Sequence, residues 1–145
     1  MPALLQSLAR ACALVAILLV AAGCGGQSSS AAVQGSVVHV TERDFQISLQ
    51  PAVTAAGVVS LVDHNKGPDT HELIVVRADG KLPLRSDDIT VNEESLKPRT
   101  LGQLPGLSPG TTSTLRLHLR PGRYEVFCNM LGHYEGGMHA ELIVR

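Results

Sequence analysis

The sequence predicts an all-β fold, a sandwich or barrel of short antiparallel strands. Short β-rich segments recur along residues 35–145, and turn residues such as Gly, Pro, Asn and Asp separate them. The same stretch shows neither the apolar period of a long amphipathic helix nor an internal repeat. Only 3% of the residues are aromatic, so the core of this fold must be mainly aliphatic.

The first 23 residues are typical of an export signal. A single charge at Arg10 precedes an apolar stretch, and small residues close the segment at Gly23. Cys24 follows directly, in an arrangement that resembles a bacterial lipoprotein signal, whose cysteine is lipidated. Ordinary cleavage near Gly23 and an uncleaved anchor are the alternatives. We therefore expect residues 1–23 to be a signal peptide and residues 24–34 a flexible tether. Residues 35–145 would then form one domain on the extracytoplasmic face of a bacterial membrane.

The first half of the domain alternates strands with turns. We expect strands over residues 36–41, 45–49 and 58–62, with a turn at 51–57 and dense turn chemistry at 65–69. His71–Arg77 is a short apolar run, which predicts a strand covered on both faces. Residues 79–111 contain four prolines and several glycines, so we expect irregular structure there, with a short helix at 87–96.

The last third has clearer periodicity. Residues 112–119 alternate strictly, with Leu115, Leu117 and Leu119 on one face. After a turn at 120–123, a strand at 124–128 places Cys128 on its inward face. The last strand, at 138–144, begins with Met138 on its inward face.

Cys128 is the one cysteine left in the folded part, because Cys12 belongs to the signal and Cys24 to its processing site. A single thiol cannot form an internal disulfide, and in an oxidising compartment it must be buried or bound. Cys128 and Met138 end and begin adjacent strands, and His133 lies midway in the glycine-rich loop between them. His71 opens another strand directly after a turn. These four side chains match the His₂Cys site with a long axial Met that holds copper in blue copper proteins.

At these residues the sequence resembles the cupredoxins, and particularly their exported rusticyanin- and sulfocyanin-like members. Residues 65–77 (NKGPDTHELIVVR) and 122–144 (GRYEVFCNMLGHYEGGMHAELIV) carry the resemblance, including the spacing Cys, four residues, His, four residues, Met. The resemblance implies a Greek-key β-sandwich of about eight strands and one type 1 copper ion. Its ligands would be His71, Cys128, His133 and Met138. Glu72 departs from the small polar residue that often follows the first histidine and helps tie the ligand loops together.

Alternative interpretations exist for single residues. A lone buried Cys or Met is usually part of a core, and the four residues point to copper only as a set. His64 is the main rival of His71 as a ligand. We expect His39, His118 and His139 on the surface, and Glu135 as a solvated loop residue.

The ligand set favours one-electron transfer, with His133 as the ligand nearest the surface. Around it, an apolar patch of Met130, Leu131, Gly132 and Tyr134 would dock briefly with a membrane-bound or soluble redox protein. The same set would also suit a copper chaperone or store that delivers copper to a membrane oxidase. A metal-free binding module with the same fold would instead have lost its site, although all four ligand types are present.

Other classes of function fit less well. A multicopper enzyme would need paired His-x-His motifs, and a dinuclear copper centre would need a second cysteine in the loop. A zinc hydrolase would need harder ligands and a carboxylate base. Without the signal, 11 basic and 13 acidic residues remain, a net charge of −2, and no basic stripe indicates nucleic acid. We therefore expect a monomeric, lipid-anchored copper protein that is not an enzyme.

Overall fold

The structure is a computed structural model that describes residues 35–78 and 80–145. The predicted signal peptide, Cys24 and the tether lie outside the described residues. In the described part of the chain, no helix is both long enough and apolar enough to span a bilayer.

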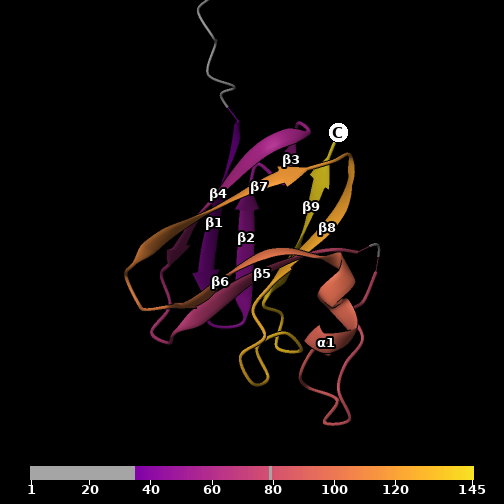
Figure 1. Cartoon of the computed structure of the whole chain (residues 1–145). Coiled ribbons are helices and arrows are strands. Elements are labelled where there is room, and N and C mark those ends of the chain that lie inside the picture. The colour runs from indigo at the N-terminus through magenta and orange to yellow at the C-terminus, as the bar shows by residue number, and fades with distance from the viewer. Residues whose placement is uncertain (1–34, 79) are drawn as a thin grey trace, which may run out of the picture. The chain divides into compact units, whose positions relative to one another are not determined.

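Nine strands form two sheets in these residues (Figure 1). The four-stranded sheet has the order β2-β1-β4-β7 and consists of β1 (Ser36–Arg43), β2 (Gln46–Gln50), β4 (Gly57–Asn65) and β7 (Thr112–Leu119). The five-stranded sheet has the order β3-β9-β8-β5-β6 and consists of β3 (Val53–Thr54), β5 (His71–Arg77), β6 (Thr100–Leu107), β8 (Gly122–Phe127) and β9 (His139–Val144). The chain passes repeatedly from one sheet to the other, which gives the Greek-key sandwich that the sequence indicates.

Each sheet is mixed rather than purely antiparallel. β1 pairs in parallel with β4, and the short β3 pairs in parallel with β9. The other neighbouring strands are antiparallel. The two sheets stay separate in the described residues, so of the two predicted architectures the chain adopts the sandwich and not a closed barrel.

Two apolar clusters hold this sandwich together. The main cluster lies between the sheets and takes Leu73 and Val75 from β5. The second cluster covers the outer face of the five-stranded sheet and takes Ile74 and Val76 from the same strand. It also contains Leu96 of the short helix α1 (Glu93–Leu96). The prediction that His71–Arg77 is a strand buried on both faces is therefore confirmed.

Three expectations about secondary structure need correction. Residues 100–107 form β6 although they contain Gly102, Pro105 and Gly106, because β6 is an edge strand and proline is tolerated there. The expected turn at 51–57 contains β3. Within the expected helix at 87–96, only Glu93–Leu96 is α-helical, and a 3₁₀ turn (Lys97–Arg99) follows.

Candidate metal centre

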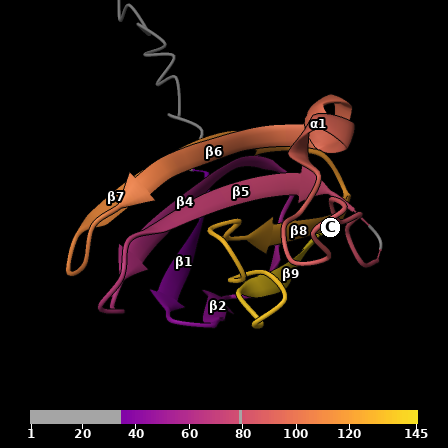
Figure 2. The same cartoon turned by 90° about the horizontal axis from the view of Figure 1, so that it is seen from below.

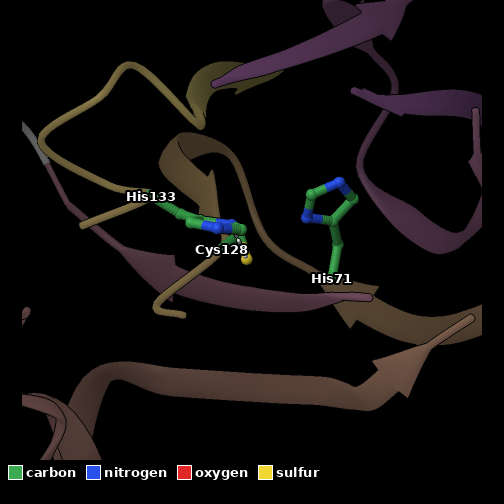
Figure 3. A group of neighbouring side chains, drawn as sticks. All are labelled: His71, Cys128 and His133. Atoms are coloured by element: carbon green, nitrogen blue, oxygen red, sulfur yellow. Dashed lines mark hydrogen bonds between the residues drawn. The ribbon is translucent and has the colours of Figure 1, made fainter. Parts of the chain in front are cut away.

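Three side chains with metal-binding atoms meet at one end of the sandwich (Figure 3). One ligand atom from each of His71, Cys128 and His133 lies within 4.8 Å of the other two. Within residues 35–78 and 80–145 this is the one group of three or more His, Cys, Asp or Glu side chains with such spacing. His71 and Cys128 are fully buried, and His133 is partly exposed.

Strand pairing explains why these residues meet. His71 is the first residue of β5, and Cys128 directly follows the last residue of β8. β5 and β8 are antiparallel neighbours, with Ile74 opposite Phe127, so the start of one strand lies beside the end of the other. Their side chains therefore reach the same end of the sandwich although 57 positions separate them in the chain.

The loop between β8 and β9 is closed by its own backbone hydrogen bonds. The amide of Cys128 donates to the carbonyl of Met138 at 3.0 Å, and the amide of Met138 donates to the carbonyl of His133 at 2.9 Å. Gly132 (φ 78°) and Gly137 (φ 112°) adopt left-handed conformations that other residues rarely tolerate. Met138 is fully buried in the main cluster, and its backbone bonds to Cys128 and His133 place it at this end of the sandwich.

The two histidines direct the same ring atom toward the thiol. Nδ1 of His133 lies 3.6 Å from Sγ of Cys128. Nε2 of His71 contacts Oδ1 of Asp44 at 3.1 Å, which leaves Nδ1 as the nitrogen that faces Cys128 and His133 in Figure 3. The two imidazole rings are 5.2 Å apart between centroids.

Burial controls the protonation of the site. Desolvation raises the pKa of the Cys128 thiol to about 11, although the backbone N–H groups of Glu72 and Met130 oppose this by favouring the thiolate. Desolvation also lowers the pKa of His71, and the neighbouring His133 lowers it further, while Asp44 acts in the opposite direction. Without a bound cation, the end of the sandwich therefore holds a neutral thiol beside a neutral His71 imidazole.

Glu72 joins the two ligand segments after all. Its backbone N–H lies close enough to the sulfur to favour the thiolate and lower the pKa of Cys128, and the backbone N–H of Asn129 likewise lowers the pKa of the Glu72 carboxyl against the larger effect of burial. The Asn129 side chain in turn accepts from the amide of Val91 at 2.7 Å and donates to the carbonyl of the same residue at 3.1 Å. A glutamate therefore makes the connection for which a smaller polar residue was expected.

The other histidines lie outside the cluster. Nδ1 of His64 bonds to the hydroxyl of Thr112 at 2.6 Å, so His64 does not compete with His71 for a place in it. His39, His118 and His139 are exposed, as predicted. Glu135 forms an ion pair with Lys81 at 3.2 Å on the surface.

The predicted docking patch needs one correction. Tyr134 is only 3% exposed, because its ring packs into the second cluster against Phe127 and its hydroxyl accepts a hydrogen bond from the amide of Leu82. Leu131 is 75% exposed. Phe45 from the β1–β2 turn, which the sequence did not indicate, is 56% exposed and contacts the ring of His133.

The sequence analysis did not identify two buried carboxyl groups, those of Glu42 and Asp63. Glu42 and Asp63 are fully buried on the paired strands β1 and β4, and no N–H or O–H group of the described residues donates to any of their four oxygens. Burial and the proximity of Asp63 raise the pKa of Glu42 to about 9, and burial raises that of Asp63 to about 6. The alternation of Val38, Val40 and Glu42 places Glu42 on the inward face, and this signal could have revealed it.

The donor set fits a soft or borderline metal ion. One thiol sulfur and two imidazole nitrogens are ligands that copper and zinc accept, and a thioether ligand from Met138, whose backbone bonds to Cys128 and His133, would favour copper. Among the described residues, neither ring nitrogen of the buried His71 has an aligned hydrogen-bond partner, and a coordination bond to Nδ1 would satisfy one of them. The residues present therefore fit a type 1 copper ion.

Solved structures with the same fold come from blue copper proteins. Auracyanin from the photosynthetic bacterium Roseiflexus castenholzii, in its reduced form, aligns with a TM-score of 0.60 and 17% identity over 77% of this chain and 98% of that chain. Auracyanin A, a "blue" copper protein from Chloroflexus aurantiacus, gives 0.59 and 17% over 77% and 99%. Rusticyanin from Thiobacillus ferrooxidans gives 0.55 and 17% over 77% and 79%.

These likenesses show the fold, which is the cupredoxin sandwich that the sequence resemblance implied. No protein-family model matches the chain, and no curated protein sequence matches it significantly.

Proposed function

We propose that this protein holds one type 1 copper ion between His71, Cys128, His133 and Met138 and transfers single electrons. The observation that carries the proposal is the convergence of the Cys128 sulfur and two imidazoles within 4.8 Å at one end of a cupredoxin fold. Copper bound there would supply a one-electron redox couple. The chain would supply a fixed set of ligands that suits both oxidation states.

The protein's part is to fix the ligands and keep water away. His71, Cys128 and Met138 are fully buried, and the hydrogen bonds of the 128–138 loop hold the last two beside His133. Ligands that cannot move need little rearrangement when the metal changes charge. The same burial favours retention of the ion, which supports an electron carrier over a copper donor, because a donor must release its metal readily.

His133 would be the exit for the electron, since it is the one histidine of the cluster that reaches the surface. Met130, Leu131 and Gly132 border it, and Phe45 takes the place in the patch that we had expected for Tyr134. A small apolar patch around a partly exposed ligand suits brief contact with a redox protein. We further propose that the protein is exported and anchored through a lipid on Cys24, which would keep it near membrane-bound partners.

The absorption spectrum of the copper-loaded protein tests the copper site. The chain without its signal is loaded with Cu(II), and we expect an intense visible band from thiolate-to-copper charge transfer. Cys128→Ser and His71→Ala should abolish this band, whereas His64→Ala, the matched control, should retain it. A colourless protein, or a band that survives Cys128→Ser, would contradict the proposal.

Copper-transfer kinetics separate the two roles. The loaded protein is mixed with a chelator of higher affinity, and an electron carrier should release copper far more slowly than it exchanges electrons with a small redox dye. Rapid release to the chelator would instead favour the copper donor.

A further inference from the structure

The turn between β1 and β2 lies against both histidines of the cluster. Oδ1 of Asp44 is 3.1 Å from Nε2 of His71, and the ring of Phe45 is 5.6 Å from that of His133, at an angle of 66°. Figure 2 shows this turn beside the loop that joins β8 and β9. The turn joins two strands of the four-stranded sheet, whereas His71 begins a strand of the five-stranded sheet and Cys128 directly follows another.

Phe45 carries two local costs. Its φ of 60° lies in the left-handed region, which is unfavourable for a bulky side chain. Its side chain is also 56% exposed. A polar residue or a glycine would avoid both costs in an ordinary turn, so the contact with His133 offers a reason for the phenylalanine.

Three glycines leave room for the turn. A Cβ on Gly67 would lie 2.8 Å from Oδ1 of Asp44 and 2.9 Å from Nε2 of His71. A Cβ on Gly136 would overlap the Phe45 ring, and one on Gly137 would lie 3.0 Å from the Phe45 carbonyl oxygen. Side chains at these positions would separate the turn from the cluster, so its close approach depends on glycines in two separate segments of the chain, at residue 67 and at residues 136–137.

The carboxylate of Asp44 is the group placed to accept a hydrogen bond from Nε2 of His71. Its Oδ1 is shielded from solvent, and no donor in the part of the chain that the structure describes is aligned with it. Nε2 of His71 lacks an aligned acceptor, and a small rotation of the ring or the carboxylate would pair the two atoms across their 3.1 Å separation. A proton held on Nε2 leaves the lone pair of Nδ1 free toward Cys128 and His133.

We propose that Asp44 and Phe45 are positioning residues of the metal centre. Asp44 fixes the tautomer and orientation of His71, and Phe45 restricts rotation of the His133 ring. A carboxylate behind a metal-binding imidazole also makes that imidazole a stronger donor, which favours the more highly charged metal ion. The assignment rests on the proposed copper site, but its first test does not require copper.

The first test determines the tautomer of His71 in the metal-free protein by ¹⁵N NMR. We expect the wild type to carry its proton on Nε2, and Asp44→Asn to keep that tautomer because the amide oxygen still accepts a hydrogen bond. Asp44→Ala should give a mixture of the two tautomers. Asp69→Asn is the matched control, because it removes a charge near His71 without removing this contact, and it should behave as the wild type. An Asp44→Ala protein that remains wholly in the Nε2–H tautomer would overturn the role of Asp44.

The second test uses the copper-loaded protein. The reduction potential should rise in Asp44→Asn, which loses the charge but keeps the acceptor, and should change far less in Asp69→Asn. An equal shift in both variants would mean that Asp44 acts only as a remote charge, and would overturn its positioning role.

For Phe45, NMR relaxation of the His133 ring in the metal-free protein should show more motion in Phe45→Ala and little change in Val37→Ala, the control at another exposed apolar residue. An unchanged His133 ring in Phe45→Ala would overturn its role. If copper never binds, the proposed function fails, but the tautomer and relaxation measurements still decide these two assignments.

Discussion

At the scale of single residues, the buried pair of carboxyl groups, Glu42 and Asp63, opposes folding when both are charged. Glu42 and Asp63 lack any hydrogen-bond donor from the rest of the described chain, so two negative charges would repel each other in a poorly solvated interior. A proton retained on Glu42 relieves this repulsion and can bridge the two groups. The pair therefore makes folding depend on pH.

The pH dependence has a definite sign. The pKa of Glu42 rises from 4.5 to about 9 on folding, so between these values the folded protein retains a proton that the unfolded chain releases. The stabilisation is complete below pH 4.5 and is lost as the pH rises toward 9, by up to about 1.4 kcal/mol per pH unit. Urea unfolding of the metal-free protein at pH 5, 7 and 9 should show this decline. Glu42→Gln should flatten it, and Glu94→Gln, at an exposed site, should not. A wild type whose stability rises over this range would contradict the assignment.

Glu72 should matter through its oxygen rather than its charge. Glu72→Gln can still accept from the backbone N–H of Asn129, so it should stay close to wild type. Glu72→Ala loses the bond and should lower the free energy of unfolding by about 1 kcal/mol. The same variant should release copper faster, because the His71 and Cys128 segments are no longer tied together. Chemical unfolding measures the loss of stability, and transfer of copper to a chelator measures the rate of release. Equal stability and equal release rates in Glu72→Gln and Glu72→Ala would refute the role of the Glu72 oxygen.

The sequence indicated the residues of the cluster because their signals were local. Cys128, His133 and Met138 lie within one loop, and the face alternation of the flanking strands was readable directly. The sequence carries no signal for a role of Asp44, because aspartate is common in turns and only its contact with His71 in the folded chain distinguishes it. Tyr134 was misassigned to the surface because its burial depends on residues 82–96, which pack on it from far along the chain.

At the scale of elements, the second cluster supports the strands that carry the ligands. Ile74 and Val76 of β5 and Phe127 of β8 face α1 and the segment before it, and these residues close the outer face of the five-stranded sheet. The apolar run at His71–Arg77 predicted that both faces of this strand are covered. It did not predict that α1 and the segment before it supply the cover on the outer face. Residues 79–111 contain too many prolines and glycines for a periodic pattern to show the edge strand β6.

Leu96→Ala tests this support. Leu96 is fully buried in the second cluster, so its truncation should cost about 2–5 kcal/mol of stability. The visible absorption band of the copper-loaded protein should persist, because Leu96 is not one of the proposed copper ligands. Leu101→Ala, at a side chain that is 40% exposed, should cost much less. Thermal unfolding and the absorption spectrum together check the result, and loss of the band with unchanged stability would contradict it.

At the scale of the whole molecule, the sequence predicted a β-sandwich but not that each sheet contains both parallel and antiparallel strand pairs. Alternation and turn residues predict strands and a sandwich, but they do not say which strands are neighbours. The parallel pairing of β1 with β4 and of β3 with β9 depends on contacts between distant segments. The position of His71 beside Cys128 likewise depends on the pairing of two distant strands, β5 and β8, which the sequence pattern does not specify.

Metal binding should stabilise the entire sandwich. Ligands from β5 and from the β8–β9 loop come together only in the folded chain, so an ion that binds them shifts unfolding by mass action. Free copper at a thousand times its dissociation constant should add about 4 kcal/mol. Calorimetry with and without a chelator measures this gain, which His64→Ala should retain and Cys128→Ser should lose. An unchanged unfolding temperature on copper loading would argue against a specific site.

The direction of β1 has a practical consequence for handling the protein. This strand starts at Ser36 and runs to Arg43, just before the turn that contacts His71, so its two ends lie about 23 Å apart at a rise of about 3.3 Å per residue. A fusion partner, an affinity tag or an electrode linker joined ahead of Gly35 would therefore sit well away from the imidazole of His133. Immobilised through that end, the molecule would leave the proposed metal centre free to meet a soluble mediator, whereas attachment at the β1–β2 turn would obstruct it.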